Sequence, residues 1–235
     1  MKMTYNEYES ALSKPRLDKY RASCGEDENK ALILYWQNIK LCQKFYGVLS
    51  IFEIVLRNAI DKHYKFCLSD NNWLLTQAQN GFLESYQERI LKERDKLVRD
   101  KNYSHDRLIA SLSLGAWTFM FSQKCYKNSG KTLLQIFPNR ASGVNQKEVY
   151  DDLDRIRQFR NRIAHLEPLC FNRSGEIYMD YVQQIYDLIT KYVEFMGYSS
   201  NELFYGVETP VATITKIKVI ENEHLPTKKL FTIKL

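Results

Sequence analysis

The segment FRNRIAHLEP, residues 159–168, combines side chains that can bind a phosphate with one that can transfer a proton. Arg160 carries a permanent charge on a planar fork that matches phosphate oxygens, and Asn161 can both donate and accept hydrogen bonds. Histidine is the side-chain type best suited to exchange a proton near neutral pH, and His165 supplies an imidazole here. These groups suit attack of an RNA 2′-hydroxyl on its adjacent phosphate, a reaction that needs no metal ion. Arg160, Asn161 and His165 are therefore the candidate catalytic residues.

The helix that positions these residues is predicted to run from about residue 146 to residue 166. Its apolar positions step by three or four residues, and Arg160 falls within that stripe. Asn161 and His165 lie one turn apart on a neighbouring row and face the same way. Pro168 is expected to end the helix, because the residue before a proline disfavours α geometry.

An arrangement without catalysis stays open for the same residues. A guanidinium within an apolar stripe is also explained by an ion pair, and the acids expected to pair with Arg160 are Glu53 or Asp154. His165, in turn, is also suited to bind the last carbonyl groups of its helix. The spacing alone does not decide between the two explanations.

A second, fainter copy of the motif lies in IFEIVLRNAIDKHY, residues 51–64. Arg57 and Asn58 are again followed by a histidine, His63, so this segment is a candidate second half-site. The alternative is a surface ladder in which Arg57 pairs with acids one turn away on either side, while His63 packs beside apolar neighbours.

The chain as a whole is predicted to be mostly helical, because its few glycines and prolines leave long stretches uninterrupted. Helical patterns cover residues 29–68, 73–79, 82–101, 104–121, 146–166 and 177–197, of which 82–101 is expected to be a solvated surface helix. The later segments VATITKIKVI and KKLFTIKL alternate and are rich in β-branched residues, which favours a small hairpin. The predicted architecture is a helical domain over 1–205, followed by a tail, 206–235, that holds the hairpin.

Composition narrows the functional classes. The five cysteines form no CxxC pair and the histidines show no metal-ligand spacing, so no disulfide framework, metal site or cofactor is predicted. No signal-peptide pattern and no run of about 18 apolar residues is present, so we expect a cytoplasmic protein without a membrane partner.

The charge distribution suits a polyanionic partner, and it is equally explained by lysines that only keep the surface soluble. The formal net charge is +6, and the segment between Ser122 and Gln146 carries bases and no acids. If the partner is RNA, we expect contacts from two arginines on the motif's helix and three lysines of this basic segment: Arg157, Arg162, Lys124, Lys127 and Lys131.

The motif RNRIAH resembles the Arg-x4–6-His signature, with a polar residue after the arginine, of the HEPN superfamily. FRNRIAHLEP, preceded by VYDDLDRIRQ, is similar in particular to the Abi-like (abortive infection) branch of that superfamily. PRLDKY near the start, FEIVLRNAI in the long helix and SLGAWTFMF fit the same branch. The resemblance spans about residues 13–195 and does not extend to the tail after Tyr205.

This resemblance implies an HEPN-type helical bundle with additional helices, and metal-independent endoribonuclease activity that leaves a 2′,3′-cyclic phosphate. It implies a homodimer in which Arg160 stabilises the scissile phosphate, His165 transfers protons and Asn161 positions one of them. Arg57, Asn58 and His63 would supply a second half-site or brace the fold.

The biological role that the resemblance suggests is a phage-defence or toxin–antitoxin ribonuclease, restrained by an antitoxin RNA or protein. Two other functions stay open from the sequence. One is a module that binds RNA or a nucleotide without cleavage, and the other is a scaffold or antitoxin that recruits a protein partner.

Overall fold

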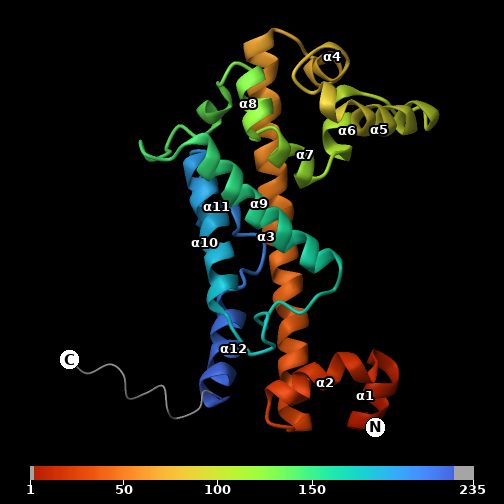
Figure 1. Cartoon of the computed structure of the whole chain (residues 1–235), viewed down its shortest axis with the longest axis vertical. Helices are drawn as coiled ribbons and strands as arrows, with labels where there is room; N and C mark the ends of the chain where they lie inside the picture. The colour runs from red at the N-terminus through yellow and green to blue at the C-terminus, as the bar shows by residue number, and fades with distance from the viewer. Residues whose placement is uncertain (1–2, 225–235) are drawn as a thin grey trace. The chain divides into compact units, whose positions relative to one another are not determined.

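The computed structural model describes residues 3–224, and every regular element in that range is a helix (Figure 1). The α-helices are α1 (Tyr5–Leu12), α2 (Lys14–Ser23), α3 (Glu28–Leu68), α4 (Trp73–Asn80), α5 (Gln87–Arg99), α6 (His105–Ser111), α7 (Leu114–Phe119), α8 (Gln123–Asn128), α9 (Gln146–Ala164), α10 (Asp180–Phe195), α11 (Ser200–Leu203) and α12 (Val211–His224). Two short 3₁₀ helices are η1 (Glu84–Tyr86) and η2 (Leu133–Ile136). Extended pairing in the same range is limited to one isolated bridge between Phe171 and Ile177. The predicted mostly-α class is confirmed for these residues.

The chain forms two compact units. The first comprises the described parts of Met1–Val48, Arg162–Asp187 and Val207–Leu235, and the second comprises Leu49–Asn161 and Leu188–Gly206. The helices α3, α9 and α10 are therefore each divided, with one part in the first unit and the other part in the second. The chain leaves the second unit after Gly206, and α12 belongs to the first unit.

The first unit is organised around the N-terminal part of α3. A capping box between Thr4 and Glu7 begins α1, and the aromatic rings of Tyr20, Tyr35 and Phe171 pack edge to face in the interior. The buried side chain of Asn38 accepts hydrogen bonds from the backbone N–H groups of Leu169 and Cys170, at 2.8 and 3.2 Å. These bonds fix the segment that follows α9 against α3.

The predicted C-terminal hairpin is wrong in its first arm, because residues 211–220 belong to α12. Buried Pro210, Thr213, Ile214 and Ile217 each lie three or four residues from two of the others, so one helical face enters the core. The Lys218 ammonium also reaches the Asp180 carboxylate at 2.9 Å. The second predicted arm, residues 228–235, lies outside the described residues.

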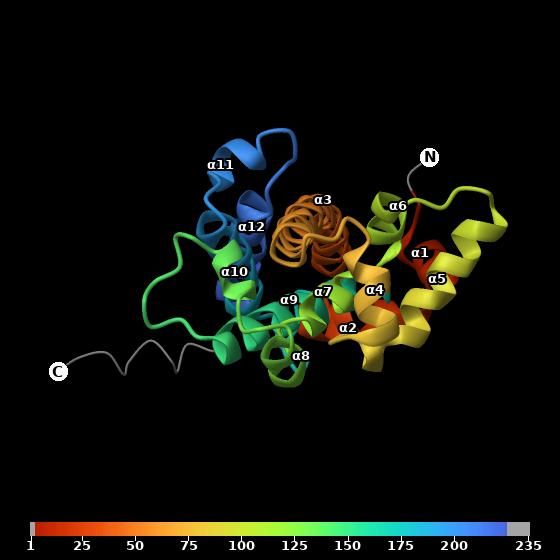
Figure 2. The same ribbon diagram turned by 90° about the horizontal axis from the view of Figure 1, so that it is seen from above.

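In the second unit, α4, α5 and α6 pack together next to the C-terminal part of α3, as two perpendicular views show (Figures 1 and 2). Trp73 and Trp117 are fully buried in this unit. The predicted helix over 104–121 is interrupted: Ser104 caps α6, but α6 ends at Ser111 and α7 begins at Leu114. Leu112 and Ser113 between them have extended backbone, with ψ angles of 143° and 165°. The interruption places the backbone of residues 113–115 next to α9, where it lines the candidate site.

None of the helices within residues 3–224 combines the length and apolar character that crossing a bilayer requires.

Candidate functional site

Arg160 and Asn161 line a small pocket in the second unit, with a volume of about 140 Å³. Its lining residues come from η1 and α5, from the start of α7 and from α9: Tyr86, Arg89, Ser113, Leu114, Gly115, Arg157, Arg160 and Asn161. Three of these are arginines and none is an acid. Because one water molecule takes about 30 Å³, the pocket has room for a phosphate group with a few waters. Its size and the charge of its lining make it a candidate site for an anion.

Asp154 orients one of the three guanidinium groups. Its carboxylate accepts hydrogen bonds from Nε and Nη2 of Arg157, at 2.8 and 2.7 Å, and also from the amide of Gln158 at 2.6 Å. Arg157 and Arg160 are three residues apart on α9, so both project from the same side of the helix. Of the two acids predicted to pair with Arg160, Asp154 therefore binds Arg157.

The second predicted acid, Glu53, interacts with Arg160 through its charge. Burial raises the pKa of the Glu53 carboxyl, while the positive charges of Arg160 and Arg57 and a hydrogen bond from the Leu114 backbone act to lower it. Glu53 does not line the pocket, although Arg160 and Leu114 do. Within residues 3–224, neither Glu53 nor Asp154 forms the predicted ion pair with Arg160, so Arg160 lines the cavity and interacts with Glu53 through its charge alone.

The third guanidinium, that of Arg89, comes from α5, the helix that was predicted to be a solvated surface helix. Its Nη1 donates to the Tyr86 hydroxyl at 3.1 Å, and the guanidinium lies over the Tyr86 ring, 5.1 Å from its centroid. Tyr86 in turn stacks on Phe119, with ring centroids 4.9 Å apart. The contact with the Tyr86 ring, which Phe119 in turn supports, gives the exposed Arg89 a defined position at the pocket.

His165, the predicted proton-transfer residue, follows directly after the last residue of α9 and is exposed in a turn. It is not among the residues that line the arginine pocket. The alternative role of capping the helix falls to the backbone: the N–H groups of Leu166 and Glu167 donate to the carbonyl oxygens of Ile163 and Arg162. The imidazole therefore faces solvent after the end of the helix.

The predicted RNA-contacting residues outside the pocket have different surroundings. Arg162 donates to the carbonyl oxygen of Pro168 at 2.7 Å and pairs with Glu167 at 3.5 Å, so it holds the turn that contains His165. Lys124 and Lys127 are exposed on α8, and the exposed Lys131 follows that helix. These three lysines form a basic surface, whereas Arg162 is engaged within its own turn.

The fainter motif does not gather its residues into one pocket. Nη1 of Arg57 lies 3.5 Å from the carbonyl oxygen of Ala110, and Asn58 is exposed. His63 is half-buried, which lowers its pKa, and its Nε2 lies 3.0 Å from the hydroxyl of Thr132. Arg57 and His63 therefore contact different parts of the second unit.

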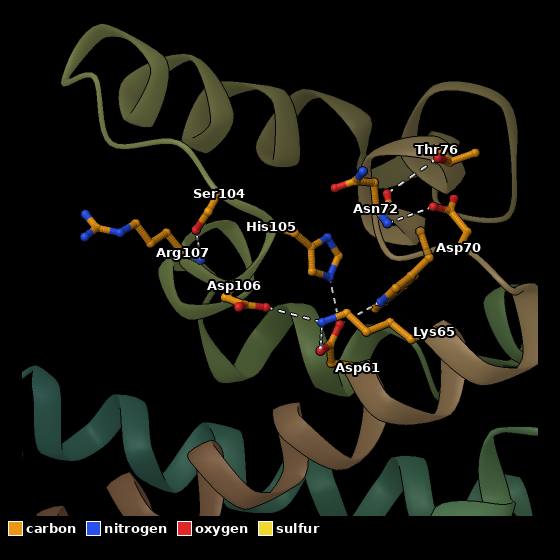
Figure 3. A network of polar contacts seen from close by, with 10 residues as sticks. Asp61, Lys65, Asp70, Asn72, Thr76, Ser104, His105, Asp106 and Arg107 are labelled. Carbon is orange, nitrogen blue, oxygen red and sulfur yellow. Dashed lines mark hydrogen bonds and ion pairs between the residues drawn. The ribbon is translucent and has the colours of Figure 1, made fainter.

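Asp61, in the same segment, is the centre of a polar network that the sequence patterns did not predict (Figure 3). Oδ1 of Asp61 accepts hydrogen bonds from Trp73 Nε1 and from His105 Nε2, both at 2.8 Å, and Oδ2 pairs with Lys65, also at 2.8 Å. Burial opposes the charge of Asp61, but these partners outweigh it and hold the pKa of its carboxyl at about 2. His105 is the first residue of α6 and is buried.

Within residues 3–224, no group of three or more His, Cys, Asp or Glu side chains is arranged to hold a metal ion. All five cysteines are free thiols.

No protein-family model, curated protein or solved structure matches the chain.

Proposed function

We propose that the protein is a metal-independent endoribonuclease that binds an RNA phosphate in the arginine pocket. The observation that carries this proposal is that Arg89, Arg157 and Arg160 line one phosphate-sized cavity without a carboxylate in its wall. Fixed guanidinium groups bind phosphate strongly and stabilise the charge that builds up on a phosphorane. In this function Arg160 holds the scissile phosphate, and Asn161 binds one of its oxygens.

The proposed reaction is an internal transesterification of RNA. The 2′-oxygen attacks the adjacent phosphorus, the bond from phosphorus to the 5′-oxygen breaks, and the products carry a 2′,3′-cyclic phosphate and a 5′-hydroxyl. One proton leaves the 2′-hydroxyl and one is delivered to the departing 5′-oxygen. His165 performs one of these transfers, for which its exposure after α9 leaves it free to meet a substrate.

The likeness of RNRIAH to the HEPN signature supports two further parts of the proposal. The chain forms an HEPN-type homodimer, so that a second copy of His165 supplies the other proton transfer. It acts in the cytoplasm as a phage-defence or toxin-type ribonuclease, restrained by an RNA or protein antitoxin. The free thiols of all five cysteines agree with a reducing compartment.

A second candidate function is an RNA-binding module without catalysis. The observation that favours it is the absence of His165 from the pocket that Arg160 lines. A site with phosphate ligands but no group for proton transfer would bind RNA in a salt-dependent manner and leave it intact.

Cleavage of total cellular RNA in EDTA tests the proposal. We expect the wild type to cleave, and Arg160→Ala to lower the rate by about 100-fold or more, as loss of a group that stabilises transition-state charge does. Lys147→Ala is the matched control, because Lys147 lies on the same helix, is 80% exposed and does not line the pocket. RNA binding without cleavage by the wild type would favour the second candidate, and equal cleavage by the wild type and Arg160→Ala would contradict the role of the pocket.

A further inference from the structure

A second cavity, with a volume of about 600 Å³, lies in the first unit between α3 and the segment that leads into α12. Most of its polar lining comes from two helices: Gln37, Lys40, Gln43 and Lys44 on α3, and Thr213 and Lys216 on α12. None of these residues lines the arginine pocket of the second unit. The cavity is therefore independent of the site on which the proposed function rests.

Helical spacing explains why these side chains converge. Gln37, Lys40 and Lys44 follow one another at intervals of three and four residues, so they share one face of α3. Thr213 and Lys216 are three residues apart and share one face of α12. Two helix faces from distant parts of the sequence thus present amines and amides to one cavity.

The charge of the cavity is positive. Its one acid, Glu208, pairs with Lys44 at 3.2 Å and is itself 84% exposed. Among the described residues, neither Lys40 nor Lys216 has an ion-pair partner, and both are exposed. Two ammonium groups in this wall are therefore left without a carboxylate, and an anionic ligand would neutralise them.

Gly47 keeps one end of the cavity open. It lies within the 41-residue helix α3, where glycine is less favourable than alanine. A Cβ atom at this position would lie 3.4 Å from the side chain of Val207, at the cavity wall. Because Gly47 and Val207 both line the cavity, a longer side chain at residue 47 would fill part of the cavity next to Val207.

We infer that this cavity binds a free nucleoside di- or triphosphate. Its volume lies within the range of small-ligand sites and suits a mononucleotide. Lys40 and Lys216, with Lys44, match the charges of a polyphosphate, while the amides of Gln37 and Gln43 can bond to sugar and base. No aromatic residue lines the cavity, so affinity comes from the phosphates more than from stacking on the base.

Isothermal titration of the full chain with ATP, ADP and adenosine, in EDTA and at low salt, tests this inference. We expect ATP and ADP to bind at one site per chain and adenosine not to bind. Lys40→Ala combined with Lys216→Ala should weaken ATP binding by about tenfold or more, as loss of hydrogen bonds to charged groups does. Lys62→Ala, at an exposed position of α3 outside the cavity, should bind ATP like the wild type.

A second variant, Gly47→Leu, tests the cavity without removing a charge. Leucine is favourable within a helix, so the variant should keep its helical circular dichroism and lose ATP binding. Absence of saturable ATP binding to the wild type would overturn the inference, as would wild-type affinity in both variants. Displacement of ATP by a single-stranded RNA without a 5′-phosphate would also overturn it, because the cavity would then be part of an RNA surface.

Discussion

Arg160 interacts with Glu53 through its charge and does not form the ion pair that was one of the two explanations of its position. Its guanidinium lines the arginine pocket and also interacts with the partly buried carboxyl of Glu53, whose pKa burial raises. A carboxyl with a raised pKa binds more protons in the folded state than in the unfolded state between the two pKa values. Folded stability contributed by this group therefore falls as pH rises through that window, from the ordinary value of 4.5 upward.

Glu53→Gln should increase the affinity for RNA, since it removes a negative charge beside Arg160 while the amide oxygen can still accept from Leu114. We expect about two- to fivefold tighter binding at low salt, the effect of one partly screened charge. Fluorescence anisotropy of a labelled RNA measures this change.

Urea unfolding of the same variant supplies the pH dependence. The stability of Glu53→Gln relative to the wild type should rise as pH increases above 4.5, because only the wild type has to ionise a buried carboxyl. Weaker RNA binding together with a stability difference that does not change with pH would show that Glu53 instead holds Arg160 in place.

Individual site residues were predictable to different degrees. Arg160 and Asn161 were found because a dense polar motif interrupts an apolar stripe, and both line the pocket. Arg89 was not found, because it belongs to a helix in which acids and bases alternate and no local signal separates it from its neighbours. Ser113 was not predicted as a site residue, because it lies in a segment predicted as one helix and no sequence pattern indicated the break between α6 and α7.

At the scale of elements, α12 shows how two periodicities can share one segment. VATITKIKVI alternates in hydrophobicity, as a strand does, yet Thr213, Ile214 and Ile217 also lie on one helical face. The packing of that face in the first unit decided the outcome, and tertiary contacts of this kind lie beyond the reach of local propensity. The long helix α3, in contrast, has the helical period alone and was predicted within one residue at its start.

Two alanine substitutions separate the helix from the predicted strand. Ile217 is fully buried whereas Val219 is 55% exposed, so Ile217→Ala should lower the free energy of unfolding by about 2–4 kcal/mol. Val219→Ala should change it by no more than about 0.5 kcal/mol. Urea unfolding of the full chain measures both values. In a strand, residues 217 and 219 would share a face, and equal losses would therefore contradict the helix.

At the scale of the whole molecule, positive charge marks both candidate sites. The formal net charge of +6 favoured a polyanionic partner, and each unit holds a cavity lined by at least three basic residues. The cavities differ in chemistry: arginines form the smaller, and lysines with amides form the larger. A polyanionic partner stays a prediction from the charge of the sequence, whereas the grouping of Lys40 with Lys216 needs α3 and α12 to meet, which no local pattern predicts.

The most direct test of the ribonuclease proposal is the chemistry of the RNA ends formed in EDTA by the wild type and by His165→Ala. His165 is exposed, so its loss should leave the fold and RNA binding intact. We predict that the wild type produces 2′,3′-cyclic phosphate ends and that His165→Ala forms them at least about 100-fold more slowly, since a proton-transfer group contributes on that order. Cyclic phosphate ends formed equally fast by the variant, or no such ends from a wild type that binds RNA, would contradict the account.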